Sequence, residues 1–413
     1  MKRTTQTLVI VSHVRHYIHR GQIYAYGPYA REIDIWADIF PEVKIAAPCQ
    51  EAVPAPDCLA LTRSNISVIP QRETGGETTR EKLVQALLLP KLCWDLMKAL
   101  RQADAIHVRC PGNLGLLGTL LAPLFSRRLI CKYSNQWSSF PSEPLSWKCQ
   151  RLILRSPWWR GPVTVYSRPA SGSRKVAPFF TSIMSSAQLA RARKAVARDR
   201  GPGGLKLLFV GRLTKSKNVG SVLSALAELR SEGIELACTV IGDGPERQTL
   251  ENFRSAHCLD GLVEFKGGVP FEAVLNELEQ AHILVLISET EGWPKAIAEG
   301  MAFGLICIGS NRGLIPELLG SGRGITVPPG DATALASVLR QIASAPSAYE
   351  PMRAKAATWA QQFSLEGVRE ALRELLERHW ATKLAPRLEA PDAVERATNS
   401  NQVPAGFDSL SLP

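Results

Sequence analysis

The sequence predicts an α/β protein built from two doubly wound parallel sheets. Three observations support this prediction. The chain has 413 residues, enough for two or three domains of ordinary size. Apolar strand-like runs alternate with helix-like segments in two successive series, a pattern typical of parallel sheets covered on both faces. The basic stretch 185–204 lies between the series and ends in Gly-Pro-Gly-Gly, so we place the domain boundary near residue 203.

The first series defines a domain of residues 1–203. Its strands are expected at 7–12, 43–47, 105–108, 129–132 and 163–166, and its helices near 29–39 and 82–101. A polar and aromatic segment with Gly21 and Gly27 is expected to be a loop. Residues 114–125 form the longest apolar stretch. Glycine, threonine and proline interrupt it, so it predicts a buried helix and no membrane span.

The second series defines a domain of residues 204–363. Its strands are expected at 206–210, 236–241, 263–265, 283–287 and 305–308, with helices at 217–231, 245–256, 271–280 and 294–303. A separate amphipathic helix, within 364–384, begins with Ser364 as its cap. The tail 385–413 has little apolar periodicity, which predicts disorder.

Composition narrows the class of protein. Apolar residues make up 45% and charged residues 21%, which excludes wholesale disorder. The nine cysteines form no C-x-x-C pair, so the sequence disfavours a zinc site and fits reduced thiols in a cytosol. The only apolar run near the amino terminus, 8–11, is too short for a signal peptide. We therefore expect a soluble cytoplasmic protein.

Charge divides the chain into two unlike halves. Residues 1–203 hold 29 basic and 13 acidic side chains, whereas 204–413 hold 20 and 25. The nets of +16 and −5 sum to the +11 of the whole chain. A strongly basic half beside a mildly acidic one indicates different partners. No recognition helix, RNP motif or zinc finger accompanies the basic half, so nucleic acid is not expected as a partner.

Three strand-to-helix junctions of the second half have polar residues where such sheets bind ligands. After the strand 206–210, Arg212 and Lys217 flank a short turn into a helix and would suit phosphates. The next junction, with Gly242 and Gly244, is interpreted mainly as a structural turn. In the third, Glu291 and Glu299 lie eight apart, and carboxylates there can bind sugar or ribose hydroxyls. The first amides of the helix, around Trp293, Pro294, Lys295 and Ala296, would suit a pyrophosphate.

The order of these motifs resembles retaining glycosyltransferases of the GT-B fold, most closely glycosyltransferase family 4 (glycosyl transferases group 1). Over about 130 residues the chain contains the family's G-R-L-x-x-x-K, G-x-G-P and G-x-V-like turns. It also has a Glu, seven residues and a second Glu in EGWPKAIAEGMAFG, followed by SNRGLIPELL and GITVPPGDATALASVL. The resemblance implies two Rossmann-like domains facing a cleft, with the carboxy-terminal helix crossing back.

The resemblance also implies roles for individual residues. The carboxy-terminal domain would bind a nucleotide-sugar donor, with Arg212 and Lys217 at the departing diphosphate. Glu299 would bind the ribose, Glu291 the donor sugar, and Val269 would lie near the base. The diphosphate itself would accept the acceptor's proton, so no protein nucleophile is assigned. No D-x-D motif occurs and the GT-B pattern requires no metal, so neither a metal nor a cofactor is expected.

The amino half matches the family less closely. His107 stands at the first position of the family's H-x-H string, but Arg109 replaces the usual second, active-site histidine. Packing and functional roles for His107 are equally open. Arg109 is the more attractive phosphate or acceptor contact. Lys295 as a phosphate contact or as a solvated lysine is also open. Gly21 and Gly27 are not the family's paired glycines, and Gly21 is retained as a candidate substrate contact.

The segment SWKCQRLILRSPWWRGP combines cations with tryptophan. Lys148, Arg151 and Arg155 fall at helical spacing near Trp158 and Trp159. Such a mixture suits an anionic membrane surface, although a core helix with solvated cations explains it equally well. Family members often build lipid-linked or surface polysaccharides. The expected partners are therefore a nucleotide-sugar donor and a glycan or lipid-linked acceptor, with peripheral contact to the inner face of the cell membrane.

Two classes of function follow. The first is a retaining glycosyltransferase of polysaccharide or glycolipid biosynthesis. The second is a non-catalytic nucleotide-sugar-binding or assembly protein of the same fold, prompted by the missing second histidine. A GT-B-like epimerase is a weaker third class because the motif order is that of family 4.

Overall fold

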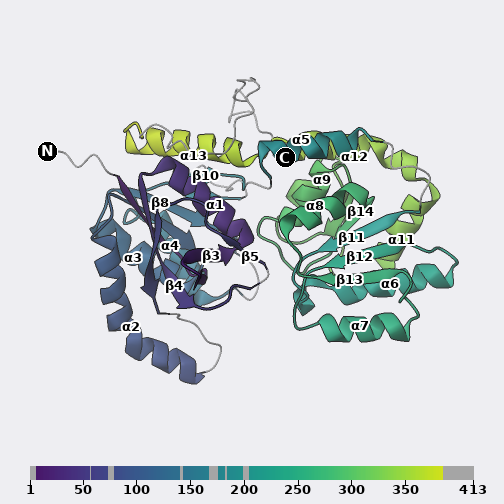
Figure 1. Ribbon diagram of the computed structural model, residues 1–413, viewed down its shortest axis with the longest axis horizontal. Coiled ribbons are helices and arrows are strands. Elements are labelled where there is room, and N and C mark those ends of the chain that lie inside the picture. Colours follow the sequence, from purple (N-terminus) through teal and green to yellow (C-terminus); the bar gives the residue numbers. More distant parts are fainter. Residues whose placement is uncertain are drawn as a thin grey trace.

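The computed structural model describes residues 6–55, 57–72, 79–139, 143–166, 175–181, 184–198 and 204–384, with backbone alone for 79–86. Two domains lie side by side, each with a sheet between layers of helices (Figure 1). The predicted α/β class, with two Rossmann-like domains, is confirmed. The predicted disorder of 385–413 concerns residues outside the described ranges.

The amino-terminal domain contains a twisted, mostly parallel sheet. Parallel strands run in the order β6-β4-β1-β7-β8-β9-β10, so the chain order reverses beside β1. The strands are β1 Thr7–Val11, β2 His16–His19, β3 Gln22–Tyr26, β4 Glu42–Glu51, β5 Cys58–Ala60, β6 Ile66–Gln71, β7 Ala105–Cys110, β8 Arg128–Tyr133, β9 Val163–Val165 and β10 Val176–Pro178. The helices are α1 Gly27–Ile39, α2 Thr79–Leu100, α3 Asn113–Leu121 and α4 Leu145–Arg155, with a 3₁₀ turn at Ala122–Leu124.

The segment expected to be a loop between the first strand and α1 is instead a hairpin, so that prediction is wrong. Strands β2 and β3 pair in antiparallel fashion, and β3 also pairs with β5 in antiparallel fashion. The turn is Arg20–Gly21, both with positive φ (50° and 75°), which is the backbone conformation that tight hairpins require. The alternating aromatic and polar residues of this segment fit a strand whose two faces differ.

The carboxy-terminal domain has a six-stranded, wholly parallel sheet in the order β13-β12-β11-β14-β15-β16. Its strands are β11 Lys206–Val210, β12 Ala237–Ile241, β13 Val263–Gly267, β14 Ile283–Leu286, β15 Ile306–Ser310 and β16 Ile325–Val327. Its helices are α5 Ser186–Val196, α6 Val219–Ser231, α7 Arg247–Ala256, α8 Phe271–Gln280, α9 Lys295–Ala302, α10 Ile315–Leu319, α11 Ala332–Ser344 and α12 Glu350–Ala360, with 3₁₀ turns at Lys215–Lys217 and Pro346–Tyr349. The last helix, α13, spans Leu365–Trp380.

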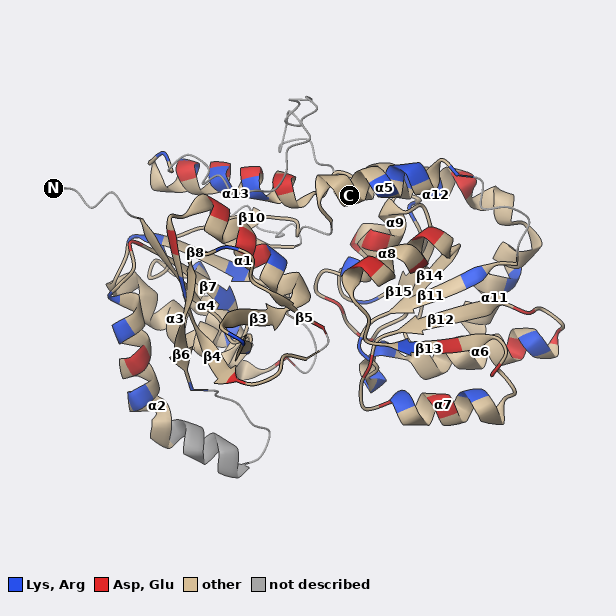
Figure 2. Cartoon of the chain, viewed as in Figure 1, with Lys and Arg blue, Asp and Glu red and all other residues tan. Residues whose placement is uncertain are grey.

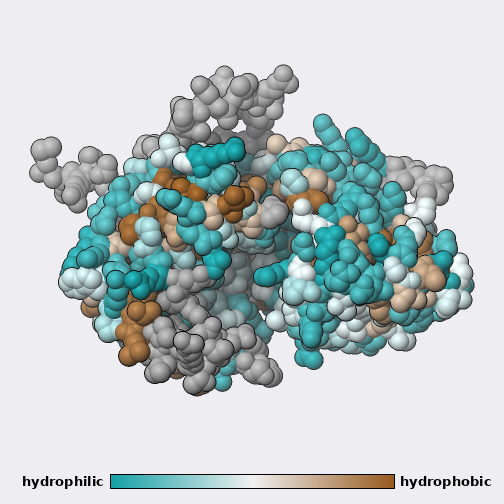
Figure 3. Space-filling view, turned by 60° about the horizontal axis from the view of Figure 1, so that its bottom comes forward, coloured by the Kyte–Doolittle hydropathy of each residue, from teal (hydrophilic) through white to brown (hydrophobic). Residues whose placement is uncertain are grey.

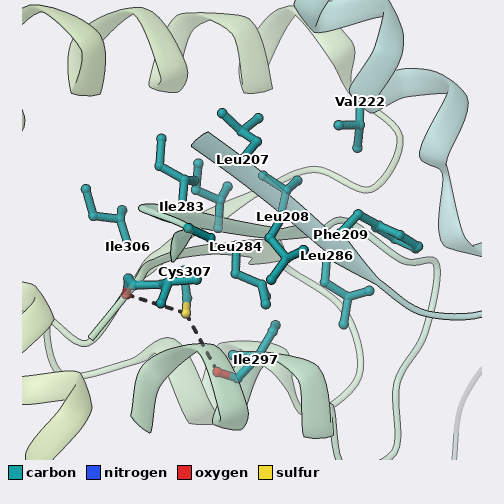
Figure 4. Close-up of a cluster of buried hydrophobic side chains, with 14 of the residues drawn as sticks. Leu207, Leu208, Phe209, Val222, Ile283, Leu284, Leu286, Ile297, Ile306 and Cys307 are labelled. Atoms are coloured by element: carbon teal, nitrogen blue, oxygen red, sulfur yellow. Dashed lines mark hydrogen bonds between the residues drawn. The ribbon is translucent and has the colours of Figure 1, made fainter. Parts of the chain in front are cut away.

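The central strands of this second sheet are apolar along their whole length because helices cover both faces. Leu208, Phe209 and Leu284 are almost fully buried between α6 on one side and α9 on the other. Figure 4 shows this cluster, in which the thiol of Cys307 contacts the carbonyl oxygens of Ile297 and Leu305 at 3.7 and 3.6 Å. The core holds the ends of β11 and β14 in fixed positions.

The boundary between the domains lies earlier than the predicted residue 203. Helix α5 precedes that residue, yet Leu189, Ala192 and Ala195 are buried in the core of the carboxy-terminal domain. Ser185 begins this helix through a capping box with Gln188. The sequence of α5 is mostly basic, and only three small or apolar residues on its inner face indicate that it packs on the second domain.

The chain crosses back as predicted. Helix α13 packs on α1, and Val368, Leu372 and Leu376 are buried in the core of the amino-terminal domain. Its outer face alternates in charge (Figure 2). The two crossings lie together, because Met184 bridges Ser364 and its carbonyl accepts a 3.0 Å hydrogen bond from the amide of Leu365.

Within the described residues, no helix combines the length and apolarity needed to cross a bilayer. None of the nine cysteines forms a disulfide. Part of the predicted basic and aromatic surface is internal. Arg151 is buried in a salt bridge with Glu143, and Trp159 is fully buried, so neither faces solvent.

Candidate functional site

The strongest candidate site lies where the strand order of the carboxy-terminal sheet reverses. Strands β11 and β14 are neighbours there, although two strands separate them in sequence. In open parallel sheets, the crevice between the loops that follow the two strands at such a reversal is the place where ligands bind. The first loop contains Arg212 and Lys217, and the second contains Glu291.

Lys217 and Glu291 meet in this crevice in a salt bridge. Both side chains are mostly buried, at 23% and 14% exposed. Asn218, in the left-handed conformation, donates to the carbonyl of Ile287 at 3.0 Å and to Glu289 at 2.9 Å. These bonds fix the lysine loop to the carboxylate loop. Arg212 is exposed on the same loop.

Glycines let the loops of the site approach one another closely. A Cβ on residue 242, where φ is +133°, would lie 1.9 Å from the carbonyl oxygen of Gly211. A Cβ on residue 313, where φ is +59°, would lie 2.3 Å from the carbonyl oxygen of Glu291. Both turns therefore require glycine. The mainly structural interpretation of Gly242 agrees with this packing, and Gly313 sets the backbone of Glu291.

Helix α9 begins at Lys295, four residues after Glu291, with Pro294 as its N-cap. Its initial amides, at Lys295 and Ala296, precede the first backbone hydrogen bond of the helix, from Ala298 to Pro294. Glu299 is 6% exposed on this helix. Burial raises the pKa of Glu299, against the opposing charges of Arg31 and Lys295.

Trp293 has a packing role that sequence reasoning did not predict. Its ring lies 5.8 Å from those of Tyr166 and Phe363 and 6.3 Å from that of Trp359. Tyr166 directly follows β9 of the amino-terminal domain, so this aromatic cluster joins the domains. Val269 is half-buried against the carboxy-terminal core, just before α8. Its predicted place near the base stays a prediction.

The amino-terminal domain faces this site across a hollow between the two lobes (Figure 3). The domains touch beside Gly292, where a Cβ would lie 2.9 Å from the carbonyl oxygen of Ser134. Arg31 of α1 extends across, its guanidinium carbon 3.9 Å from the ring centre of Phe271. Sequence reasoning missed Arg31, which follows the Gly-Pro start of α1 and had no motif to mark it.

Arg109 is not available to a substrate as the sequence suggested. It is 8% exposed and donates to Glu32 at 2.6 Å, while Lys132 donates to the other oxygen of Glu32 at 2.8 Å. Burial alone would raise the pKa of Glu32, but the charges of Arg109 and Lys132 outweigh it and hold that pKa well below its usual range. The sequence signal for this triad is a charged residue near the end of each of two buried strands, Arg109 in β7 and Lys132 in β8.

His107 is a packed strand histidine. It is fully buried, and its ring lies 4.4 Å from that of Trp36. Burial and the charge of Arg109 lower the pKa of His107 well below its usual value, so the imidazole is neutral. Gly21 is at the hairpin turn, and no heavy atom lies within 4 Å of the position its Cβ would take. His107 thus lies near Arg109 inside the amino-terminal domain, and Gly21 lies at the hairpin turn.

Lys295 of the carboxy-terminal domain lies near cations of the amino-terminal domain. Burial, together with the nearby charges of Lys132 and Arg31, lowers the pKa of Lys295 to about 7. No group of three or more His, Cys, Asp or Glu that could hold a metal ion occurs in the part of the chain that the structure describes.

Comparisons with known proteins agree with this geometry. Residues 194–359 match the sequence family described as glycosyl transferases group 1. The amylovoran biosynthesis glycosyltransferase AmsK of Erwinia amylovora is 33% identical over 192 residues, which are 44% of this chain and 46% of that protein. Glycogen synthase of Mycobacterium tuberculosis is 30% identical over 179 residues, 43% of each chain. The matched segment thus spans less than half the length of these relatives.

Solved structures extend the likeness to both domains. Sucrose-phosphate synthase from Thermosynechococcus elongatus has a TM-score of 0.68 at 20% identity, over 91% of this chain and 99% of that one. HepE of Anabaena, in complex with UDP and glucose, has a TM-score of 0.65 at 14% identity, over 90% and 100%. At such identities the likeness concerns the fold. The chain therefore has the GT-B fold, and its residues 194–359 are similar to glycosyl transferases group 1.

Proposed function

We propose that the protein transfers a sugar from a nucleotide-sugar donor to a glycan or lipid-linked acceptor, with retention of the anomeric configuration. The observation that carries the proposal is the Lys217–Glu291 pair at the point where the carboxy-terminal strand order reverses. A cation and a carboxylate held together there suit a diphosphate and the hydroxyls of a sugar.

The reaction needs few groups of the protein. The bond between the anomeric carbon and the diphosphate oxygen breaks as the acceptor oxygen bonds to that carbon. The acceptor's hydroxyl proton passes to the departing diphosphate, and the nucleoside diphosphate leaves. Lys217 and Arg212 stabilise the charge on the diphosphate, Glu291 orients the sugar, and Glu299 binds the ribose. We propose that no metal takes part.

Substitution of Lys217 tests this proposal. Loss of one preorganised cation should lower kcat/KM by about 100- to 1,000-fold, equivalent to about 3–4 kcal/mol. Lys217→Ala and Glu291→Ala are compared with Lys215→Ala, an exposed lysine of the same turn, which should retain activity. Binding is measured by thermal shift with UDP, GDP and ADP, and transfer with a panel of donors. Full binding and transfer in both site variants would refute the assignment.

One observation favours the non-catalytic alternative. Of the two residues at the family's H-x-H positions, His107 is packed against Trp36 and Arg109 is paired with Glu32, so neither presents a free side chain to the cleft. If the wild-type protein binds a nucleotide sugar but neither transfers nor hydrolyses it with any acceptor extract, the binding function replaces the enzymatic one.

We also propose that the protein acts at the cytoplasmic face of a membrane through α4 and the segment that follows it. Leu145, Leu152 and Trp158 are 77%, 66% and 42% exposed, and Lys148 and Arg155 are exposed beside them. Trp158 donates to the carbonyl of Leu120 at 3.2 Å, which joins this surface to the end of α3. Exposed apolar side chains with cations suit the interface of an anionic bilayer.

Vesicle sedimentation tests the membrane proposal. The protein should sediment with vesicles that contain phosphatidylglycerol and not with pure phosphatidylcholine, and salt should release it. Leu152→Glu should weaken this binding. Leu59→Glu, on exposed strand β5 of the same domain, is the matched control. Equal sedimentation with both kinds of vesicle, or with neither, would refute the claim.

A further inference from the structure

Four cations and two carboxylates meet where α9 faces the amino-terminal domain. Arg31, Arg109, Lys132 and Lys295 are the cations, and Glu32 and Glu299 the carboxylates. Glu32 is shared by Arg109 and Lys132. In the described part of the chain no carboxylate lies within salt-bridge distance of Arg31 or Lys295. The site therefore has an excess of positive charge.

Three of these cations, of which only Lys132 has a paired carboxylate, are not solvated surface residues. Arg31 lies against Phe271 with its Nη1 buried and without a hydrogen-bond partner. Lys132 is 12% exposed at its side chain, and Lys295 is half-buried on the first turn of α9. Buried charge is costly unless it is paired. The low pKa of Lys295 is the response expected of a cation that lacks an anion.

Two of these cations, Arg31 and Lys132, belong to the domain opposite the predicted diphosphate site. The predicted diphosphate cations, Arg212 and Lys217, belong to the loop after β11. Lys132 instead ends β8 of the opposite domain, two residues before Ser134, which touches Gly292 beside Glu291. A sugar bound to Glu291 would lie between that carboxylate and the amino-terminal domain, so Lys132 lies on the sugar's side. Lys295 is near enough to Lys132 for that charge to lower its pKa.

We propose that Arg31, Lys132 and Lys295, the interdomain cation cluster, bind the carboxylate of a hexuronic acid, borne by the donor sugar or by the acceptor glycan. Two ammonium groups and a planar guanidinium suit the two oxygens of a carboxylate. A neutral sugar would leave Arg31 and Lys295 without a paired anion. This inference rests on the proposed function and names the class of substrate that the site selects.

Binding of matched nucleotide sugars tests the donor source. UDP-glucuronate is compared with UDP-glucose, and GDP-mannuronate with GDP-mannose, by titration calorimetry with the full chain. The wild type should bind the acidic member about 10- to 100-fold more tightly, as expected for hydrogen bonds to a charged group. Lys295→Met should reduce this ratio to about one, and Lys295→Arg should restore most of it. Lys215→Met is the matched control and should leave the ratio unchanged.

A second arm tests the acceptor source. A disaccharide ending in glucuronate is compared with its glucose counterpart in the presence of UDP or GDP, with the same variants. Dependence on Lys295 in this arm alone assigns the carboxylate to the acceptor. Equal affinity for acidic and neutral ligands in both arms overturns the proposal and leaves the glycosyltransferase assignment intact. Absence of binding to every nucleotide and nucleotide sugar overturns both.

Discussion

The two domains share a doubly wound parallel sheet, but they differ in the side chains at the edge where such sheets bind ligands. In the carboxy-terminal domain, Gly242 and Gly313 bring neighbouring loops against the loops after β11 and β14, where Lys217, Glu291 and exposed Arg212 lie. In the amino-terminal domain, the equivalent edge is closed by internal pairing of Arg109, Lys132 and Glu32. Topology thus decides where a site can form, and the side chains decide whether it is open.

The stability of the amino-terminal domain should depend strongly on Glu32, which pairs with both cations at the closed edge. Glu32→Gln removes the carboxylate that compensates two buried cations, which should destabilise the amino-terminal domain by about 3–5 kcal/mol. Thermal unfolding measures the loss. Glu232→Gln, which affects a surface pair with Arg340, is the control and should cause little change. An equally small effect at Glu32 would mean that the triad does not stabilise this domain.

Substitution of the glycines at the open edge of the carboxy-terminal domain should reduce activity more than stability. In Gly313→Ala, the new Cβ would overlap the carbonyl of Glu291 and displace that loop. A displacement near 1 Å should lower kcat/KM by about 100-fold. Gly261→Ala, where a Cβ meets nothing within 4 Å, is the control. Unchanged turnover in the first variant would show that the position of Glu291 is not critical.

Ligand binding between the two domains should depend on pH. The groups facing Lys295 are Lys132, Arg31, Glu32 and Glu299, and its pKa is lowered to about 7. Because the protonated form binds anions, affinity for a nucleotide uronate should fall between pH 6 and 8, by no more than about tenfold per unit. Calorimetry should give a flat profile for Lys295→Met.

The same pKa has a consequence for the unliganded protein. The folded-state pKa of Lys295 is below its ordinary value, so the unfolded chain binds more protons above pH 7. The contribution of Lys295 to stability should therefore rise from about pH 7 towards the ordinary lysine pKa. A decrease in this contribution over that range, measured against Lys295→Met, would contradict the assigned shift.

The smallest effect is expected at His107. Both of its ring nitrogens are buried without a hydrogen-bond partner, so an apolar side chain of similar size should be tolerated. His107→Leu should change kcat/KM by less than about threefold and leave the thermal midpoint equal or higher. A loss of turnover with unchanged folding would instead assign His107 a role in the reaction.

Sequence reasoning succeeded where one local pattern determined the structure. Helix α8 was predicted at its observed bounds, and β11 as well, because apolar periodicity and flanking proline or glycine decided them. The hairpin β2–β3 was missed because Arg20 and Gly21 form a turn without the usual Asn-Gly signal.

For the site, the motif residues of the carboxy-terminal domain could be found, since they follow consecutive strands. The Lys217–Glu291 salt bridge confirms that two of them lie together. The pairing of Arg109 with Glu32 could not be found, because 77 residues separate them and only the fold brings them together. The same holds for Arg31 and Phe271. Membership of family 4 in particular stays a prediction.

Because the chain crosses between the domains near both Met184 and Ser364, the amino-terminal domain is built from two separate segments of the chain. Its core includes Leu372 and Leu376 of α13, more than 180 residues beyond the crossing at Met184. A fragment that stops at that crossing would expose Ile33 and Phe40, which α13 covers. During synthesis this domain must therefore wait for the last helix before its core is sealed.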